Sequence, residues 1–173
     1  MIMYPKISRK IFSCHPALER NCFMGDHMPF NTAASDGVYS FTLEATAENY
    51  AMAQERVRSF LSPFPCSFRA LLDLDMIVEE IFINIANYAY TDRVGTVTIE
   101  LSLNAHGDTL TMVFRDSGIP YDPLRKETPD LTAPAAQRPI GGLGIFLVQE
   151  LSDSISYKHT GSENCLTICK KIR

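Results

Sequence analysis

The sequence predicts an α/β fold, a two-layer sandwich in which a mixed, mostly antiparallel sheet carries its helices on one face. The first observation is a set of short segments in which apolar and polar residues alternate, as in strands with one buried face. These segments occur in two pairs, 96–103 with 109–115 and 154–159 with 165–171. The second observation is helical spacing of apolar residues in two longer segments, 47–61 and 67–90.

The remaining elements follow from local signals. Residues 38–43 are rich in β-prone side chains and predict a first strand. The turn 105–108 contains Gly107 and Asp108 and predicts a hairpin. Residues 144–151 predict a short helix. The proline-rich stretch 119–140 predicts a long loop, and loops of this length in compact domains are usually functional.

Length and composition indicate one main domain. The chain has 173 residues, of which 46% are hydrophobic, enough for one core. Residues 1–36 show no steady hydrophobic period and contain three prolines, so we expect an accessory leader there. The domain itself is expected to cover residues 37–173.

Charge and cysteine content exclude several classes of protein. The net charge is −4 and no basic block occurs, which argues against nucleic acid as the main partner. No apolar run is long enough to predict a membrane span. The five cysteines form no CxxC pair, so free thiols in the cytoplasm are expected.

One candidate site lies on the second predicted helix. Glu80, Asn84 and Tyr88 are spaced four residues apart and therefore share a helix face. This pattern fits a helix with an ordinary polar edge. It also fits a site in which the amide oxygen of Asn84 binds Mg²⁺ while Glu80 acts as a general base.

A second candidate follows the strand that ends near residue 115. The carboxylate of Asp116 can accept a hydrogen bond from an exocyclic amine such as that of adenine, and Gly118 allows close approach of a ring. The alternative is a plain strand-to-turn exit, where Asp and Gly are common.

A third candidate is the glycine-containing segment 141–144, which opens a helix. Helix N-termini bind phosphates through free N–H groups and the helix dipole. The alternative is a hinge. The segment is not a dinucleotide fingerprint, because Leu147 stands where a third glycine would fall, and no Gly-Lys-Ser/Thr occurs in the chain.

In their order and spacing, the three motifs resemble the Bergerat (GHKL) ATP-binding fold of gyrase, Hsp90, histidine kinases and MutL. Glu80 to Tyr88 looks like the Asn box, and the two glycine segments look like the two glycine boxes. The late-strand Thr167 resembles the threonine that supports the adenine-binding Asp. The resemblance implies these binding residues for ATP: Asn84, Asn87, Tyr88, Asp116, Gly118, Arg138, Gly141, Gly142, Leu143, Gly144 and Thr167, with Asn84 also holding Mg²⁺.

Segments 116–123 and 141–148 are similar to the stand-alone anti-sigma-factor serine/threonine kinases of bacteria. This implies transfer of the ATP γ-phosphate to a Ser or Thr of a partner regulatory protein, with Glu80 as the base. Arg138, or failing it Arg125, would contact the γ-phosphate from a lid formed by residues 121–140. The implied partner is a sigma factor, an anti-anti-sigma (STAS-type) protein, or both, and a homodimer is suggested.

Two other functions fit the same motifs. The chain fits a non-catalytic ATP-binding module that sequesters a sigma factor or another regulator, and it also fits a detached ATPase subunit. Only Glu80 separates the kinase from the binding module, because a pure binder does not need a base at that position. Tyr88, at a position where histidine is frequent, and Pro120, in place of a later glycine, depart from the histidine-kinase pattern.

Overall fold

The computed structural model describes residues 37–125 and 143–173. The elements in these two ranges are β1 (Tyr39–Glu44), η1 (Ala47–Asn49), α1 (Tyr50–Leu61), α2 (Phe68–Tyr88), β2 (Thr96–Leu103), β3 (Thr109–Asp116), η2 (Pro123–Arg125), α3 (Leu143–Leu151), β4 (Ser154–Thr160) and β5 (Glu163–Lys171). Every predicted strand and helix is present, with bounds shifted by a few residues at most. The helix expected from residue 47 starts as the 3-10 turn η1 before α1 begins.

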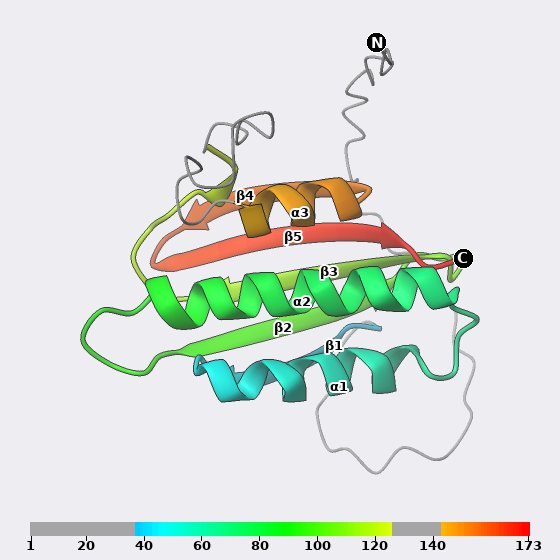
Figure 1. The fold of residues 1–173 in the computed structure, drawn as a ribbon, viewed down its shortest axis with the longest axis horizontal. Coiled ribbons are helices and arrows are strands. Elements are labelled where there is room, and N and C mark those ends of the chain that lie inside the picture. Colours follow the sequence, from blue (N-terminus) through cyan, green and yellow to red (C-terminus); the bar gives the residue numbers. More distant parts are fainter. Residues whose placement is uncertain (1–36, 126–142) are drawn as a thin grey trace, which may run out of the picture. The chain divides into compact units, whose positions relative to one another are not determined.

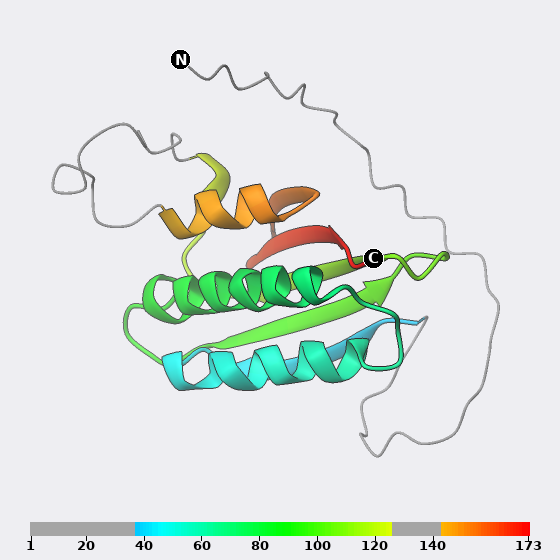
Figure 2. The same cartoon turned by 45° about the vertical axis from the view of Figure 1, so that its right-hand side comes forward.

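The strands form one sheet in the order β1-β2-β3-β5-β4, and each neighbouring pair is antiparallel. The three α-helices cover one face of this sheet (Figure 1, Figure 2). The predicted two-layer α/β fold is therefore confirmed, and the sheet of the described ranges is antiparallel throughout rather than mixed. No helix in these ranges combines the length and the apolar character needed to cross a membrane.

The core forms where the sheet faces the helices. Every second residue of β3 is buried, from Leu110 to Asp116, because alternate side chains of a strand point to the same face. The apolar stripe of α2 packs against this face, with Ile77, Val78 and Phe82 fully buried. Asp116 thus continues the line of core-facing positions at the end of β3.

A cap and a backbone bond fix the start of α2. Ser67 has extended backbone and its hydroxyl accepts a hydrogen bond from the N–H of Ala70 at 3.2 Å, which satisfies one free donor of the first turn. The N–H of Ser67 donates to the carbonyl of Ile172 at 2.7 Å. These contacts attach α2 to the end of the chain that follows β5.

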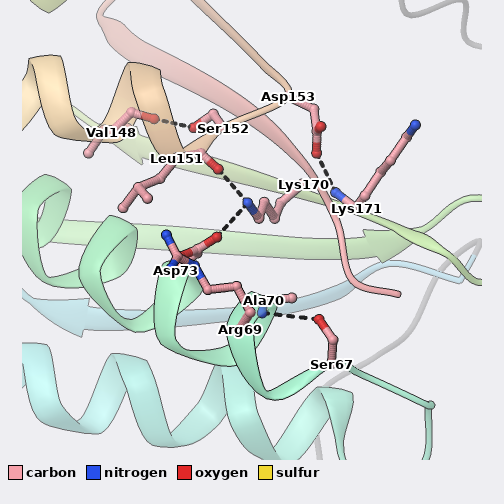
Figure 3. Close-up of polar contacts among 10 residues, drawn as sticks. All are labelled: Ser67, Arg69, Ala70, Asp73, Val148, Leu151, Ser152, Asp153, Lys170 and Lys171. Atoms are coloured by element: carbon pink, nitrogen blue, oxygen red, sulfur yellow. Dashed lines mark hydrogen bonds and ion pairs between the residues drawn. The ribbon is translucent and has the colours of Figure 1, made fainter.

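A charged cluster holds the C-terminal end of α3 against α2 (Figure 3). Lys170 on β5 donates to Asp73 Oδ2 at 2.8 Å and to the carbonyl of Leu151 at 2.6 Å. Arg69 donates to the other oxygen of Asp73 at 2.8 Å. Burial alone would raise the pKa of Asp73, but Lys170 and Arg69 outweigh it and hold that pKa below its ordinary value.

Candidate functional site

Asp116 ends β3 with its carboxylate held from one side. The residue is 8% exposed. Its Oδ1 accepts a hydrogen bond from the N–H of Gly118 at 2.9 Å and another from Asn164 Nδ2 at 2.8 Å. Among the described residues, both hydrogen bonds accepted by this carboxylate go to Oδ1. Oδ2 is therefore the oxygen that these residues leave for an external donor.

Asn164, which is 6% exposed, stands directly opposite Asp116 in the β3–β5 register. Besides Asp116, its amide nitrogen faces the carbonyl of Ile119 at 3.1 Å. Its amide oxygen accepts from the hydroxyl of Tyr157 at 2.7 Å and lies 3.3 Å from His159 Nδ1. Burial raises the pKa of Tyr157 further above its ordinary value, which already keeps the hydroxyl protonated at neutral pH.

The sequence analysis missed Asn164 and expected Thr167 to support Asp116. In the structure Thr167 pairs with Val113 and Ser156, three positions away from the Asp116 row. Three positions along a strand also reverse the direction of the side chain, so Thr167 belongs to the face away from the helices. The support of Asp116 therefore comes from Asn164, which corrects the expected role of Thr167.

The turn after Asp116 packs on the C-terminal end of α2. The N–H of Ile119 donates to the carbonyl of Ala89 at 2.9 Å. A Cβ on Gly118 would lie 2.7 Å from the carbonyl carbon of Ala89, so only glycine fits this approach. This contact joins the first glycine segment to the helix that carries Asn84.

Tyr90 reinforces the same junction, although the sequence did not single it out. Its hydroxyl donates to the carbonyl of Thr96 at 2.6 Å and accepts from the N–H of Ser117 at 3.0 Å. A Cβ on Gly95 would overlap the Tyr90 ring. One tyrosine thus connects the loop before β2 with the turn after β3.

The helix face of α2 that carries Glu80 and Asn84 meets the first turn of α3 at Glu80. Glu80 and Asn84 are half-buried, whereas Asn87 and Tyr88 are exposed. The Glu80 carboxyl group lies against Gly144, and a Cβ at that glycine would be 2.9 Å from Glu80 Cδ. The expected base and the last glycine of the second glycine segment are therefore in contact.

The other expected residues are placed only in part. Leu143 starts α3 and is 55% exposed. Arg125 lies next to Asp122, with Nε 3.3 Å from Oδ2, and its side chain is 87% exposed. Arg138, Gly141 and Gly142 lie outside the described residues, as does residue 126 onward of the expected lid. No cluster of three or more His, Cys, Asp or Glu side chains suited to a metal occurs within the described ranges.

Comparisons with known proteins show the family of the chain. The chain is similar to the serine-protein kinase RsbW of Bacillus cereus, with 28% identity over 121 residues that span 68% of this chain and 74% of the relative. It is also similar to the serine-protein kinase RsbW of Bacillus thuringiensis, with 27% identity over the same shares.

A solved structure shares the fold. The crystal structure of the RsbU and RsbW domains of a Mycobacterium tuberculosis protein matches 78% of this chain with a TM-score of 0.56 and 14% identity. The match spans 32% of that longer chain. The sequence profile of the histidine kinase-like ATPase domain matches residues 43–170. The chain belongs to the histidine kinase-like ATPase domain family.

Proposed function

We propose that this chain is an ATP-dependent serine/threonine kinase that phosphorylates a partner regulatory protein, as anti-sigma-factor kinases do. The observation that carries the proposal is the contact between Glu80 and Gly144, beside the helix row that holds Asn84. A purely binding site needs no carboxylate against its phosphate-binding turn. The similarity to serine-protein kinases supports the same reaction class.

Asp116 is proposed to read the adenine base. A carboxylate oxygen only accepts hydrogen bonds, and the 6-amino group of adenine donates them. The burial of Asp116 strengthens this contact, because few waters compete for the oxygen. The close packing of Gly118 on Ala89 holds the turn after Asp116 against the end of α2.

The residues around α3 fit Mg-ATP phosphates. The side-chain oxygen of Asn84 is a hard ligand of the kind Mg²⁺ prefers, and the first turn of α3 offers free N–H groups. When bound, Mg²⁺ would neutralise charge that develops on the transferred phosphoryl group. Asn87, Tyr88 and Leu143, which are exposed, are proposed as further contacts of the nucleotide.

Glu80 is proposed to accept the proton of the incoming Ser or Thr hydroxyl. It lies one helical turn before Asn84, so one rigid helix would hold both the metal ligand and the base. The proton moves from the substrate hydroxyl to a carboxylate oxygen of Glu80. The substrate oxygen bonds to the γ-phosphorus, and the bond from that phosphorus to ADP breaks, so that ADP leaves. Arg138, or Arg125 in its place, is proposed to pair with the γ-phosphate.

Labelled ATP and candidate partner proteins test this function. The purified chain is incubated with γ-labelled ATP and with sigma factors or STAS-type proteins encoded in the same genome. The expected result is label on a Ser or Thr of one partner. Glu80→Gln should slow transfer about 100-fold or more while ATP affinity stays nearly intact, since a positioned base contributes roughly this factor.

Two results oppose the proposal. Transfer at the wild-type rate by Glu80→Gln removes Glu80 from the mechanism. ATP-dependent partner binding without any transfer assigns the chain to the non-catalytic binding modules. Glu79→Gln is the matched control, because Glu79 is the exposed neighbour of Glu80 on α2 and should leave transfer unchanged.

A further inference from the structure

The amide of Asn164 is a built-in part of the Asp116 site. Asn164 is buried, faces Asp116 across the β3–β5 pair and donates to Asp116 Oδ1 at 2.8 Å. The same oxygen accepts from the backbone of Gly118 at 2.9 Å. We propose that Asn164 is a positioning residue that gives the site its preference for 6-aminopurine nucleotides, by fixing Asp116 so that Oδ2 faces the base.

The orientation of the Asn164 amide is determined by its surroundings. On the nitrogen side stand only acceptors, Asp116 Oδ1 and the carbonyls of Gly118 and Ile119. On the oxygen side stands the hydroxyl of Tyr157 at 2.7 Å. A flipped amide would bring its oxygen against three acceptors, so the observed orientation is strongly favoured.

This fixed donor determines what the second carboxylate oxygen can do. A free carboxylate turns easily about its last bond and presents either oxygen. With Oδ1 held by two donors, rotation would break both hydrogen bonds, and Oδ2 keeps one direction. An oxygen so fixed attracts the amino group of a 6-aminopurine and repels the carbonyl oxygen of a 6-oxopurine.

The sheet connects this selectivity to its last hairpin. Tyr157 on β4 bonds to the oxygen of the Asn164 amide on β5, and the nitrogen of that amide bonds to Asp116 on β3. The three residues come from three adjacent strands of the sheet. Loss of the Tyr157 hydroxyl should therefore weaken the same selectivity, to a smaller degree than loss of Asn164.

Calorimetry with two nucleotides tests the inference, which rests on the proposed ATP site. ATP and purine riboside triphosphate differ only in the 6-amino group. Asn164→Leu should weaken ATP binding about tenfold, the factor for one lost hydrogen bond to a charged group. Binding of purine riboside triphosphate should change less than about twofold, because it makes no contact that depends on the direction of Oδ2. Thr111→Val, on the strand of Asp116 but on the opposite face, is the matched control and should change neither affinity.

Tyr157→Phe gives a second measurement if Asn164→Leu fails to fold. It keeps the ring and should weaken ATP binding about threefold without affecting binding of the analogue. The effect is smaller because the Tyr157 hydroxyl acts on Asp116 only through the Asn164 amide. Equal weakening of both nucleotides, or no weakening of either, overturns the inference while leaving the ATP site intact. A wild-type chain that binds neither nucleotide overturns the proposed function and this inference together.

Discussion

The carboxyl group of Glu80 and the Cα of Gly144 are in contact, with no space for a Cβ between them. The two residues come from α2 and α3, and the cluster of Asp73, Lys170 and Leu151 holds the same two helices together further along. Glu80 lies seven positions after Asp73 on α2, and Leu151 lies seven positions after Gly144 on α3. The two contacts are therefore the same distance apart on both helices, as in an antiparallel pair.

Gly144→Ala should displace Glu80 and lower phosphoryl transfer without lowering the stability of the fold. The added Cβ must displace the flexible carboxyl group, whereas alanine favours the helix by about 1 kcal/mol over glycine. We expect an unchanged or higher melting temperature and phosphoryl transfer lowered about 100-fold, as for a misplaced catalytic group. Single-turnover transfer and a thermal melt measure the two effects. In a Glu80→Gln background the same substitution should cost transfer nothing more, and an additive loss would contradict this explanation.

Asp116→Asn should abolish adenine recognition. Gly118 and Asn164 both donate to Oδ1, so the new amide must keep its oxygen on that side and turn its NH₂ toward the ligand. Donor would then face donor, and ATP affinity should fall by about 100-fold or more. Calorimetry measures it, with Asp153→Asn at the other end of the sheet as control. Unchanged affinity would remove Asp116 from the site.

Asn84→Ala should weaken Mg-ATP more than metal-free ATP. The substitution removes one oxygen ligand and leaves the helix intact, because alanine is the best helix former. Calorimetry measures the ATP affinity with Mg²⁺ and with a chelator. The gain in affinity from Mg²⁺ should be about tenfold larger in the wild type than in the variant. Equal losses in both titrations would argue against a metal-ligand role.

Tyr90→Phe should loosen the turn after β3. The variant loses the hydrogen bonds to Thr96 and Ser117 but keeps the ring against Gly95. Stability should fall by roughly 1–2 kcal/mol, and ATP affinity should fall with it because Ser117 follows Asp116 directly. Denaturant unfolding and calorimetry measure the two. Tyr88→Phe, at an exposed hydroxyl on α2, should leave stability unchanged.

Asp73 should make stability depend on acid pH. Its folded-state pKa lies below the unfolded one, so the folded protein binds fewer protons, and its contribution is complete above the unfolded pKa. The contribution is lost as pH falls through the folded pKa, below about pH 4. Asp73→Asn should cost roughly 3 kcal/mol near neutral pH, as for a broken buried ion pair, and flatten this acid decline. Melting curves from neutral to acid pH test it. A parallel decline in both proteins would contradict the assignment.

The sequence predicts much of this fold because the relevant signals are local. Alternation along β2 and β3 and helical spacing along α2 determine each element without knowledge of its neighbours. Asp116 was singled out by the same kind of local signal, because it stands at the end of a predicted strand, and its role in base recognition stays a prediction.

Its partner was not predictable in the same way. Which residue of β5 stands beside Asp116 depends on strand register, and Thr167 differs from Asn164 by an odd number of positions, which changes the face. The sequence did contain a signal for Asn164. It alternates with Leu166 and Ile168 and therefore points to the core, where a polar side chain needs a hydrogen-bond partner. Tyr90 had no such signal, because its two contacts depend on the path of a loop.

The strand order also determines when Asp116 gains its partner Asn164. β5 lies between β3 and β4, so the residue that orients Asp116 follows it by 48 positions in the chain. During synthesis, β1, β2 and β3 can pair while Asp116 still lacks its partner, and the contact forms only when the distant strand docks. If the proposed adenine contact is right, a chain cut before β5 should fail to select ATP even where its earlier strands fold, and selective ATP binding would report that β5 has docked.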